Sequence, residues 1–146
     1  MRYLAIDPGG STGWAVFEDG KLLDCGACAP PGLRWRGIQG VLVEMPQKYP
    51  HDNVDSNNLI TLAYRLGRVV GPLEIEGVPI RTVHPKEWKG QLSKDVCHLR
   101  GRKKMTPPEL ELMDLRALPL SAKARLDMLD AVCLGLWALT TGMWHK

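Results

Sequence analysis

The segment that most constrains the fold is the run from Leu126 to Leu139, LDMLDAVCLGLWAL. Its only charged residues are Asp127 and Asp130, in a segment that is otherwise apolar nearly all round. A helix of this kind lies mostly inside a protein. Two acids three residues apart share a helix face and repel each other, and burying them is costly unless they are paired or bind a cation. We therefore expect cations at this helix.

Two other acids stand at the ends of short apolar runs. RYLAI leads into Asp7, and VLV leads into Glu44. If these runs are neighbouring parallel strands, the two carboxylates meet at one edge of a sheet, and a helix crossing that edge brings Asp127 and Asp130 opposite. A cluster of four carboxylates has raised pKa values unless divalent metals neutralise it. Its all-oxygen ligands favour Mg²⁺ or Mn²⁺ over zinc.

Each acid also has a simpler interpretation, as a helix cap, a turn residue or a hydrogen-bonded surface group. For Asp7 and Glu44 the sequence leaves both interpretations open. For Asp127 and Asp130 the simpler one is less favoured, because nothing in their segment offers a cationic partner.

The order of strand and helix signals predicts an α/β fold with a mixed five-stranded sheet flanked by helices. RYLAI and GWAVFEDGKLLDCGA read as three antiparallel strands, with a turn at residues 18–20 in the second segment. VLVE and VPIRTVHP read as two further strands, the last stopped by Pro85. Because the long helical pattern from about residue 55 to 73 separates them, we expect a right-handed parallel crossover.

The later helices are predicted from their caps. Ser93 can cap a short helix that ends before Gly101, and Thr106 with Glu109 has the spacing of a capping box with proline at the first helical position. That helix should end near residue 117, and Ser121 can cap a final helix that continues to about residue 140.

Length and composition predict one domain spanning residues 1–146, because 146 residues with 45% apolar content suit one core. No apolar stretch reaches the roughly 18 residues of a membrane span, and the start MRYLAID does not resemble a signal peptide. We expect a cytoplasmic protein with free thiols and no membrane partner. Cys25 and Cys28 have zinc-like spacing, but there is no second such pair, and on a strand the two side chains point to opposite faces.

The formal charge of +3 is small, so the distribution of charge matters more than the sum. If several of the acids gather in one metal site, the remaining surface is more basic than the total suggests. For the run at residues 100–104 we favour contact with backbone phosphates over a solvated helix end. The candidate phosphate-binding residues around this run are Lys86, Lys89, Lys94, Arg100, Arg102, Lys103 and Lys104.

Four segments in order, IDPGGSTGWAV, VLVEMPQ, VHPKEWKG and LDMLDAVCLGLWAL, resemble the motifs of RuvC-like Holliday junction resolvases in the RNase H-like superfamily. The first motif alone is weak, because sugar kinases and actin-like ATPases carry a similar phosphate loop. The ordered set is much more specific. The resemblance implies a metal-dependent endonuclease that resolves four-way DNA junctions and leaves 5′-phosphate ends.

The resemblance also implies roles for particular residues. Asp7, Glu44, Asp127 and Asp130 match the family's acids and would hold two Mg²⁺ ions per active site, with Mn²⁺ able to substitute. Lys86 and Lys89 lie near its basic segment and would contact phosphates. The family acts as a homodimer with the long helix at the interface. In this chain Gly67 and Gly71 could permit two helices to approach closely there, and they are equally compatible with ordinary packing of a helix on a sheet. The corresponding interface residues here would be Leu59, Leu62, Leu66, Gly67 and Gly71.

The chain departs from the bacterial pattern and resembles the compact viral branch, which implies the cytoplasm of a bacterial or phage-infected cell. The glycine bend after Asp7 is one residue shorter, and APPGLRWRGIQG replaces a helix. Within this segment Arg34 and Arg36 are candidate DNA contacts. Trp35 can stack on an unpaired base, although covering the edge of the core is the favoured use.

Other functions are compatible with parts of the sequence. A related nuclease of the same fold could act on other branched DNA or on structured RNA. A kinase or ATPase is disfavoured by length and by the missing second phosphate loop. A non-catalytic nucleic-acid-binding module ranks last, because four acids near DNA would oppose binding.

Overall fold

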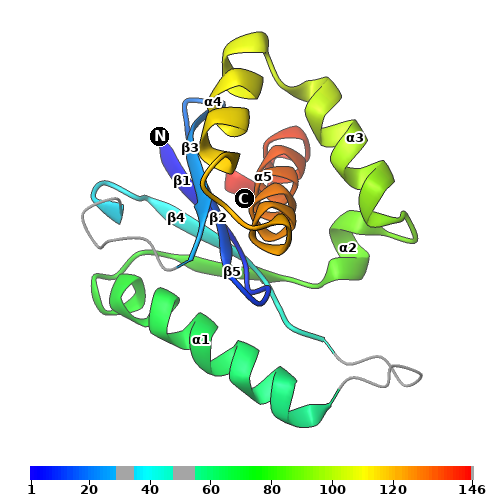
Figure 1. The fold of residues 1–146 in the computed structure, drawn as a ribbon. Helices are drawn as coiled ribbons and strands as arrows, with labels where there is room; N and C mark the ends of the chain where they lie inside the picture. Colours follow the sequence, from blue (N-terminus) through cyan, green and yellow to red (C-terminus); the bar gives the residue numbers. More distant parts are fainter. Residues whose placement is uncertain (29–34, 48–54, 146) are drawn as a thin grey trace.

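The computed structural model describes residues 1–28, 35–47 and 55–145. A five-stranded sheet runs through the centre of this part of the chain, in the order β3-β2-β1-β4-β5 (Figure 1). The strands are β1 (Arg2–Asp7), β2 (Gly13–Glu18), β3 (Lys21–Ala27), β4 (Gly40–Glu44) and β5 (Ile80–Val83).

The sheet is mixed, as the sequence predicts. β1, β2 and β3 pair antiparallel, whereas β1, β4 and β5 pair parallel. The turn between β2 and β3 falls at the predicted place. Its residues Asp19 and Gly20 both have positive φ, at 49° and 81°, the backbone geometry of a tight hairpin turn.

The predicted helices are also present. They are α1 (Ser56–Ile75), α3 (Lys94–Lys104), α4 (Pro107–Ala117) and α5 (Ala122–Thr140). Two short helices that the sequence did not predict are added to them, α2 (Pro85–Lys89) and η2 (Met143–His145). The side chains of Asp55, Ser93 and Ser121 accept hydrogen bonds from the first turns of α1, α3 and α5. Thr106 and Glu109 form the predicted capping box of α4.

Two details differ from the prediction. Pro85 stops β5, but it also begins the short helix α2, because a proline fits the first helical position. α3 does not end before Gly101 but continues to Lys104. Gly101 is buried, and a Cβ added there would lie 2.5 Å from Cys133 Sγ. The glycine therefore lets α3 approach α5 rather than ending the helix.

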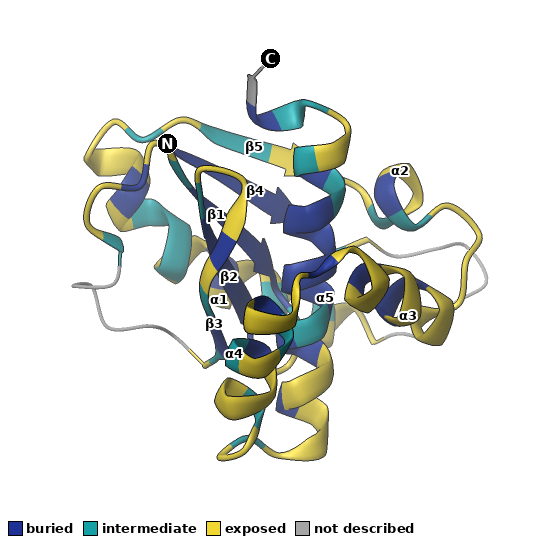
Figure 2. Ribbon diagram, turned by 90° about the horizontal axis from the view of Figure 1, so that it is seen from above, coloured by how far each residue is buried: buried dark blue, intermediate teal, exposed yellow. Residues whose placement is uncertain are grey.

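Helices cover the two faces of the sheet unequally. α1 lies along one face, while α5 lies against the other with α3 and α4 beside it (Figure 1). Eleven residues of α5 are buried, and the ribbon coloured by burial is dark along the inner strands β1, β2 and β4 and along much of α5 (Figure 2). The close approach of α5 to β2 requires glycine, because a Cβ at Gly135 would lie 2.0 Å from the ring of Phe17. α5 is thus the nearly all-apolar internal helix that the sequence predicts.

The opposite face has a smaller core, centred on Leu4, Ile6, Val41 and Val43 of the sheet. Trp35 packs against this core and meets Trp14 edge to face, with 6.0 Å between ring centroids. This contact matches the core-covering use that the sequence favours for Trp35. In the described part of the chain, no helix has the length and apolar character needed to cross a membrane.

Candidate active site

Asp7 and Glu44 lie at the ends of two neighbouring parallel strands. In the register of β1 and β4, Ile6 pairs with Val43, so the next residue of each strand is an acid. Both acids are buried, with 6% and 8% of their surface exposed. α5 crosses this edge of the sheet and places Asp130, which is fully buried, near Asp7. Three of the four predicted acids therefore converge at one place.

The electrostatics of Asp7 show how close these acids are. Burial raises the pKa of Asp7 well above its ordinary value, and the charges of Glu44 and Asp130 raise it further. A hydrogen bond with Asp130 has the same effect on the pKa of Asp7, because it favours the protonated form. Lys89 opposes these effects but does not cancel them. Asp7 thus occupies a position where added positive charge would be strongly stabilising.

Glu44 is held by the short helix α2. The indole Nε1 of Trp88 donates a hydrogen bond to Oε2 of Glu44 at 2.5 Å, and Nζ of Lys89 lies 3.0 Å from the same oxygen. Lys89 also approaches Asp130 Oδ2 at 3.8 Å, so its ammonium group lies between two of the acids. The motif VHPKEWKG therefore supplies both an anchor and a counter-charge to the site.

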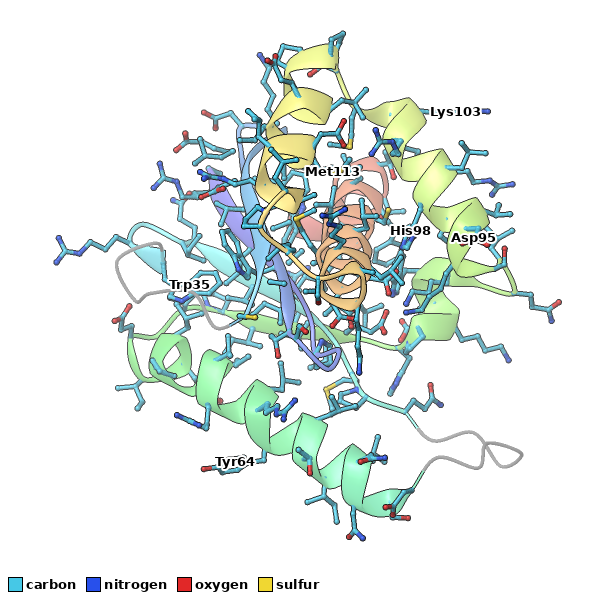
Figure 3. All side chains as sticks on the ribbon, in the orientation of Figure 1. Trp35, Tyr64, Asp95, His98, Lys103 and Met113 are labelled. Atoms are coloured by element: carbon cyan, nitrogen blue, oxygen red, sulfur yellow. The ribbon has the colours of Figure 1, made fainter. Side chains whose placement is uncertain are left out.

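Asp130 receives its partners from α3. Nε2 of His98 lies 2.7 Å from Oδ1 of Asp130, and Nζ of Lys94 lies 2.7 Å from Oδ2. Figure 3 shows His98 on the side of α3 that faces α5. Burial alone would raise the pKa of Asp130, but the hydrogen bond to His98 and the charges of Lys89 and Lys94 lower it. Asp130 is therefore the charged neighbour that Asp7 faces.

Asp127, the fourth predicted acid, is directed toward the glycine loop after β1. Its Oδ2 accepts a hydrogen bond from the backbone N–H of Ser11 at 2.8 Å. A Cβ added at Gly9 would lie 2.3 Å from Asp127 Oδ1, so this loop needs glycine to pass the carboxylate. Burial lowers the pKa of Lys94, but the hydrogen bond and charge of Asp130 raise it, and the charge of Asp127 adds a smaller contribution in the same direction. Asp127 therefore lies at the edge of the acid cluster, next to the glycine loop after β1.

The chemistry of the donor set fits hard divalent cations. Four buried carboxylates face two ammonium groups, those of Lys89 and Lys94, so negative charge is in excess. Oxygen ligands of this kind suit Mg²⁺ or Mn²⁺. In the arrangement described here, the carboxylates turn toward lysine, histidine and backbone donors. Across residues 1–28, 35–47 and 55–145, no three acidic, histidine or cysteine side chains are grouped so that they would ligate one ion.

The other predicted basic residues have different positions. Arg102 pairs with Asp114 of α4 at 3.1 Å, and Lys103 projects away from the protein in Figure 3. Arg100 and Lys104 line a cavity between α3 and α5. Arg36 and Lys86 are exposed, and Arg34 lies outside the described residues.

Two side chains that hydrogen-bond to the acids were not predicted from the sequence. They are Trp88, which contacts Glu44, and His98, which contacts Asp130. His98 follows Lys94 by four residues, so the two share one face of α3. That spacing is the only signal that could have suggested His98. Nothing in the sequence indicates which element this face packs against.

The mixed five-stranded sheet with its flanking helices is an RNase H-like α/β fold, and acids stand at the carboxyl ends of its strands β1 and β4. The chain has the fold of RuvC. It is similar to a Thermus thermophilus RuvC structure and to T. thermophilus RuvC in complex with a Holliday junction substrate, with TM-scores of 0.62 and 0.65. The identities are 20% and 21%, and the alignments cover 99% of this chain and 97% and 96% of the solved chains. No family model and no curated protein matches the sequence.

Proposed function

We propose that this protein is a divalent-metal-dependent endodeoxyribonuclease that resolves four-way DNA junctions by paired cuts. The observation that carries the proposal is the convergence of Asp7, Glu44 and Asp130, with Asp127 at its border, on one edge of the sheet. The similar solved structure with a Holliday junction bound supports the choice of substrate. The short glycine bend supports a place in the compact viral branch of this class.

In this proposal Asp7, Glu44, Asp127 and Asp130 hold two Mg²⁺ ions, or Mn²⁺ in their place. When bound, such ions supply an activated water and stabilise the leaving oxygen of phosphodiester hydrolysis, which leaves 5′-phosphate ends. Trp88 and His98 keep Glu44 and Asp130 in position through their hydrogen bonds. Lys89 and Lys94 partly neutralise the acids and bring positive charge to the place where a DNA phosphate would bind.

We also propose a homodimer formed through α1. Of its predicted interface residues, Leu66 packs into the core with 7% exposure, whereas Gly67 and Gly71 leave open space beside the helix. The exposed side chains Ile60, Tyr64 and Ile75 lie on the same helical stripe as these glycines, and Figure 3 shows Tyr64 pointing away from the sheet. The stripe is therefore the surface that a second copy would cover, placing two active sites in one symmetric particle.

Size-exclusion chromatography with light scattering tests the dimer. Ile60→Glu with Tyr64→Glu should convert a dimer to a monomer, because two buried charges would have no partners. Asn58→Glu, on the opposite side of α1, should leave the dimer intact. A wild-type monomer, or a dimer that survives both stripe substitutions, would contradict the proposed interface.

Cleavage of labelled substrates tests the activity. Four-way junction, splayed-arm, linear duplex and structured RNA substrates are incubated with Mg²⁺, Mn²⁺ or EDTA, beside an Asp7→Asn control. Paired, metal-dependent nicks in the junction, with the linear duplex left intact, are the expected result. If the protein cuts only splayed arms or RNA, the same active site acts on a substrate other than the four-way junction.

A second candidate function, a non-catalytic nucleic-acid-binding module, has one observation in its favour. Lys89 and Lys94 already pair with Glu44 and Asp130, so the acids are partly neutralised by the protein itself. Binding of the junction without cutting under any metal in the same assay would support this candidate over the nuclease.

A further inference from the structure

A small cavity opens beside the candidate active site, between α2, α3 and α5. Its volume is about 140 Å³, and its walls are mostly apolar, with Trp88, Trp137 and Cys133 among them. Arg100 and Lys104 of α3 also line it. Nothing in the proposed hydrolysis uses this cavity.

The cavity and the acid cluster share a wall. The indole of Trp88 donates its hydrogen bond to Glu44, and the same side chain lines the cavity. α3 connects the two sites, because Lys94 contacts Asp130 while Arg100 lines the cavity. The rise of a helix separates Lys94 from Arg100 by about 9 Å. With about 3.4 Å of rise per nucleotide in one strand, DNA at the acids would reach the cavity within roughly three nucleotides.

The charges at the cavity suit a phosphate. Arg100 and Lys104 are four residues apart on one face of α3, and within the described residues neither forms an ion pair or a side-chain hydrogen bond. Arg102, between them, is paired with Asp114. Burial raises the pKa of the Cys133 thiol to about 12, so the inner wall carries no negative charge that would oppose an anion at the rim.

The apolar walls suit an aromatic ring. Tryptophan side chains provide stacking surfaces for bases, and stacking accepts any base because every base has a π-face. A cavity of about 150 Å³ admits a ring of the size of benzene. The volume here therefore fits a single six-membered ring, as in a pyrimidine, better than a purine.

We propose that this cavity binds one unstacked base of the DNA strand being cut, while Arg100 and Lys104 hold an adjacent phosphate. The proposal rests on the nuclease function above and deepens it, since it names the part of the substrate that the enzyme extracts from the base stack. The base would fix the strand relative to Glu44 through the shared Trp88 wall.

Photocrosslinking tests this proposal with the Asp7→Asn protein, which should bind junctions without cutting them. Each junction carries one 5-iodouracil within three nucleotides of the phosphate that the wild-type protein cuts, and crosslinked peptides are mapped by mass spectrometry. We expect one position to crosslink to Trp88 or Trp137. Arg100→Gln or Lys104→Gln should lower that yield roughly tenfold, because a phosphate contact is lost. Lys21→Gln, an exposed cation on β3 away from the cavity, should leave the yield within about twofold.

Two results would overturn the proposal. One is a bound junction that gives no crosslink to either tryptophan, and the other is a crosslink whose yield is unchanged in both α3 variants. If the wild-type protein cuts no junction, the proposed function fails separately. The cavity is then tested with a single-stranded 5-iodouracil hexanucleotide. A crosslink to a tryptophan that depends on Arg100 and Lys104 would support the proposed base site. The absence of such a crosslink would contradict it.

Discussion

Asp7 and Glu109 are both buried carboxylates, but their surroundings differ. Glu109 accepts hydrogen bonds from the backbone N–H of Leu22 and from the backbone and hydroxyl of Thr106, each at 2.7 Å. Although burial opposes the charge, these bonds lower the pKa of Glu109. Asp7 faces Glu44 and Asp130, which raise its pKa together with burial. Burial alone therefore does not distinguish a functional acid from a structural one in this protein. The distinction lies in whether the neighbours of the carboxylate are hydrogen-bond donors or other acids.

The largest expected effect comes from Asp7→Asn. Junction cleavage should fall by about 10²- to 10³-fold or more, the order seen when an electrostatic group of an active site is removed. The folded protein should be as stable as the wild type or more stable, because asparagine keeps the volume and removes a charge that its neighbours disfavour. Cleavage rates and thermal unfolding together check this prediction. A variant that cuts at the wild-type rate would contradict the account of the site.

The next effect concerns the position of Asp130. His98→Ala should lower cleavage by roughly 10- to 100-fold, since partners that orient metal-binding groups commonly have effects of this size. His98→Gln, which keeps a side-chain donor, should restore part of the activity. Single-turnover cleavage at saturating protein checks both variants. Equal activity in His98→Ala and the wild type would show that Lys94 and Lys89 position Asp130 without help.

Glu109→Gln should produce the opposite pattern from Asp7→Asn. We expect a loss of about 1–3 kcal/mol in the free energy of unfolding, because the neutral amide replaces charge-assisted hydrogen bonds to Leu22 and Thr106. Cleavage per folded molecule should stay at the wild-type level. Chemical denaturation and cleavage rates measure the two quantities, and Glu111→Gln, exposed on the same helix, is the matched control. A cleavage defect without a stability loss would remove the contrast between the two regions.

The smallest effect is the pH dependence of that stability loss. Because the pKa of folded Glu109 is lowered, its stabilisation is fully present above the ordinary value near 4.5 and is lost as the pH falls through the folded value. The difference in unfolding free energy between wild type and Glu109→Gln should therefore be constant near neutral pH and shrink in acid. If the difference in unfolding free energy between the two proteins grew as the pH fell, this would contradict a lowered pKa for Glu109 in the folded protein.

The sequence was sufficient to predict the sheet and where the acids lie in the strands and the last helix, because apolar runs that end on an acid are visible without a structure. Asp7 and Glu44 follow from the strand pattern, and Asp130 follows from its place in a helix that is apolar nearly all round. The capping-box role of Glu109 was also predictable, because it depends on residues three apart. Its bond to Leu22, on a strand 87 positions away, depends on how α4 docks and has no local signal.

The partners of the acids could not be predicted for the same reason. His98 reaches Asp130 only because Gly101 lets α3 lie close to α5 at Cys133. Trp88 reaches Glu44 because Pro85 begins a helix at the end of β5. The basic residues at 100–104 also have different surroundings that the sequence does not show. Arg102 pairs with Asp114, whereas Arg100 and Lys104 line the cavity.

The central claim is that the acids around Asp7 form a cation site while Glu109 is structural. The most direct test is the midpoint of thermal unfolding with and without Mn²⁺ for the wild type, Asp7→Asn and Glu109→Gln. A ligand that binds only the folded state raises the midpoint, by several degrees at concentrations well above its Kd. We predict such a rise for the wild type and for Glu109→Gln, and little or none for Asp7→Asn. No rise in the wild type, or an equal rise in Asp7→Asn, would contradict the claim.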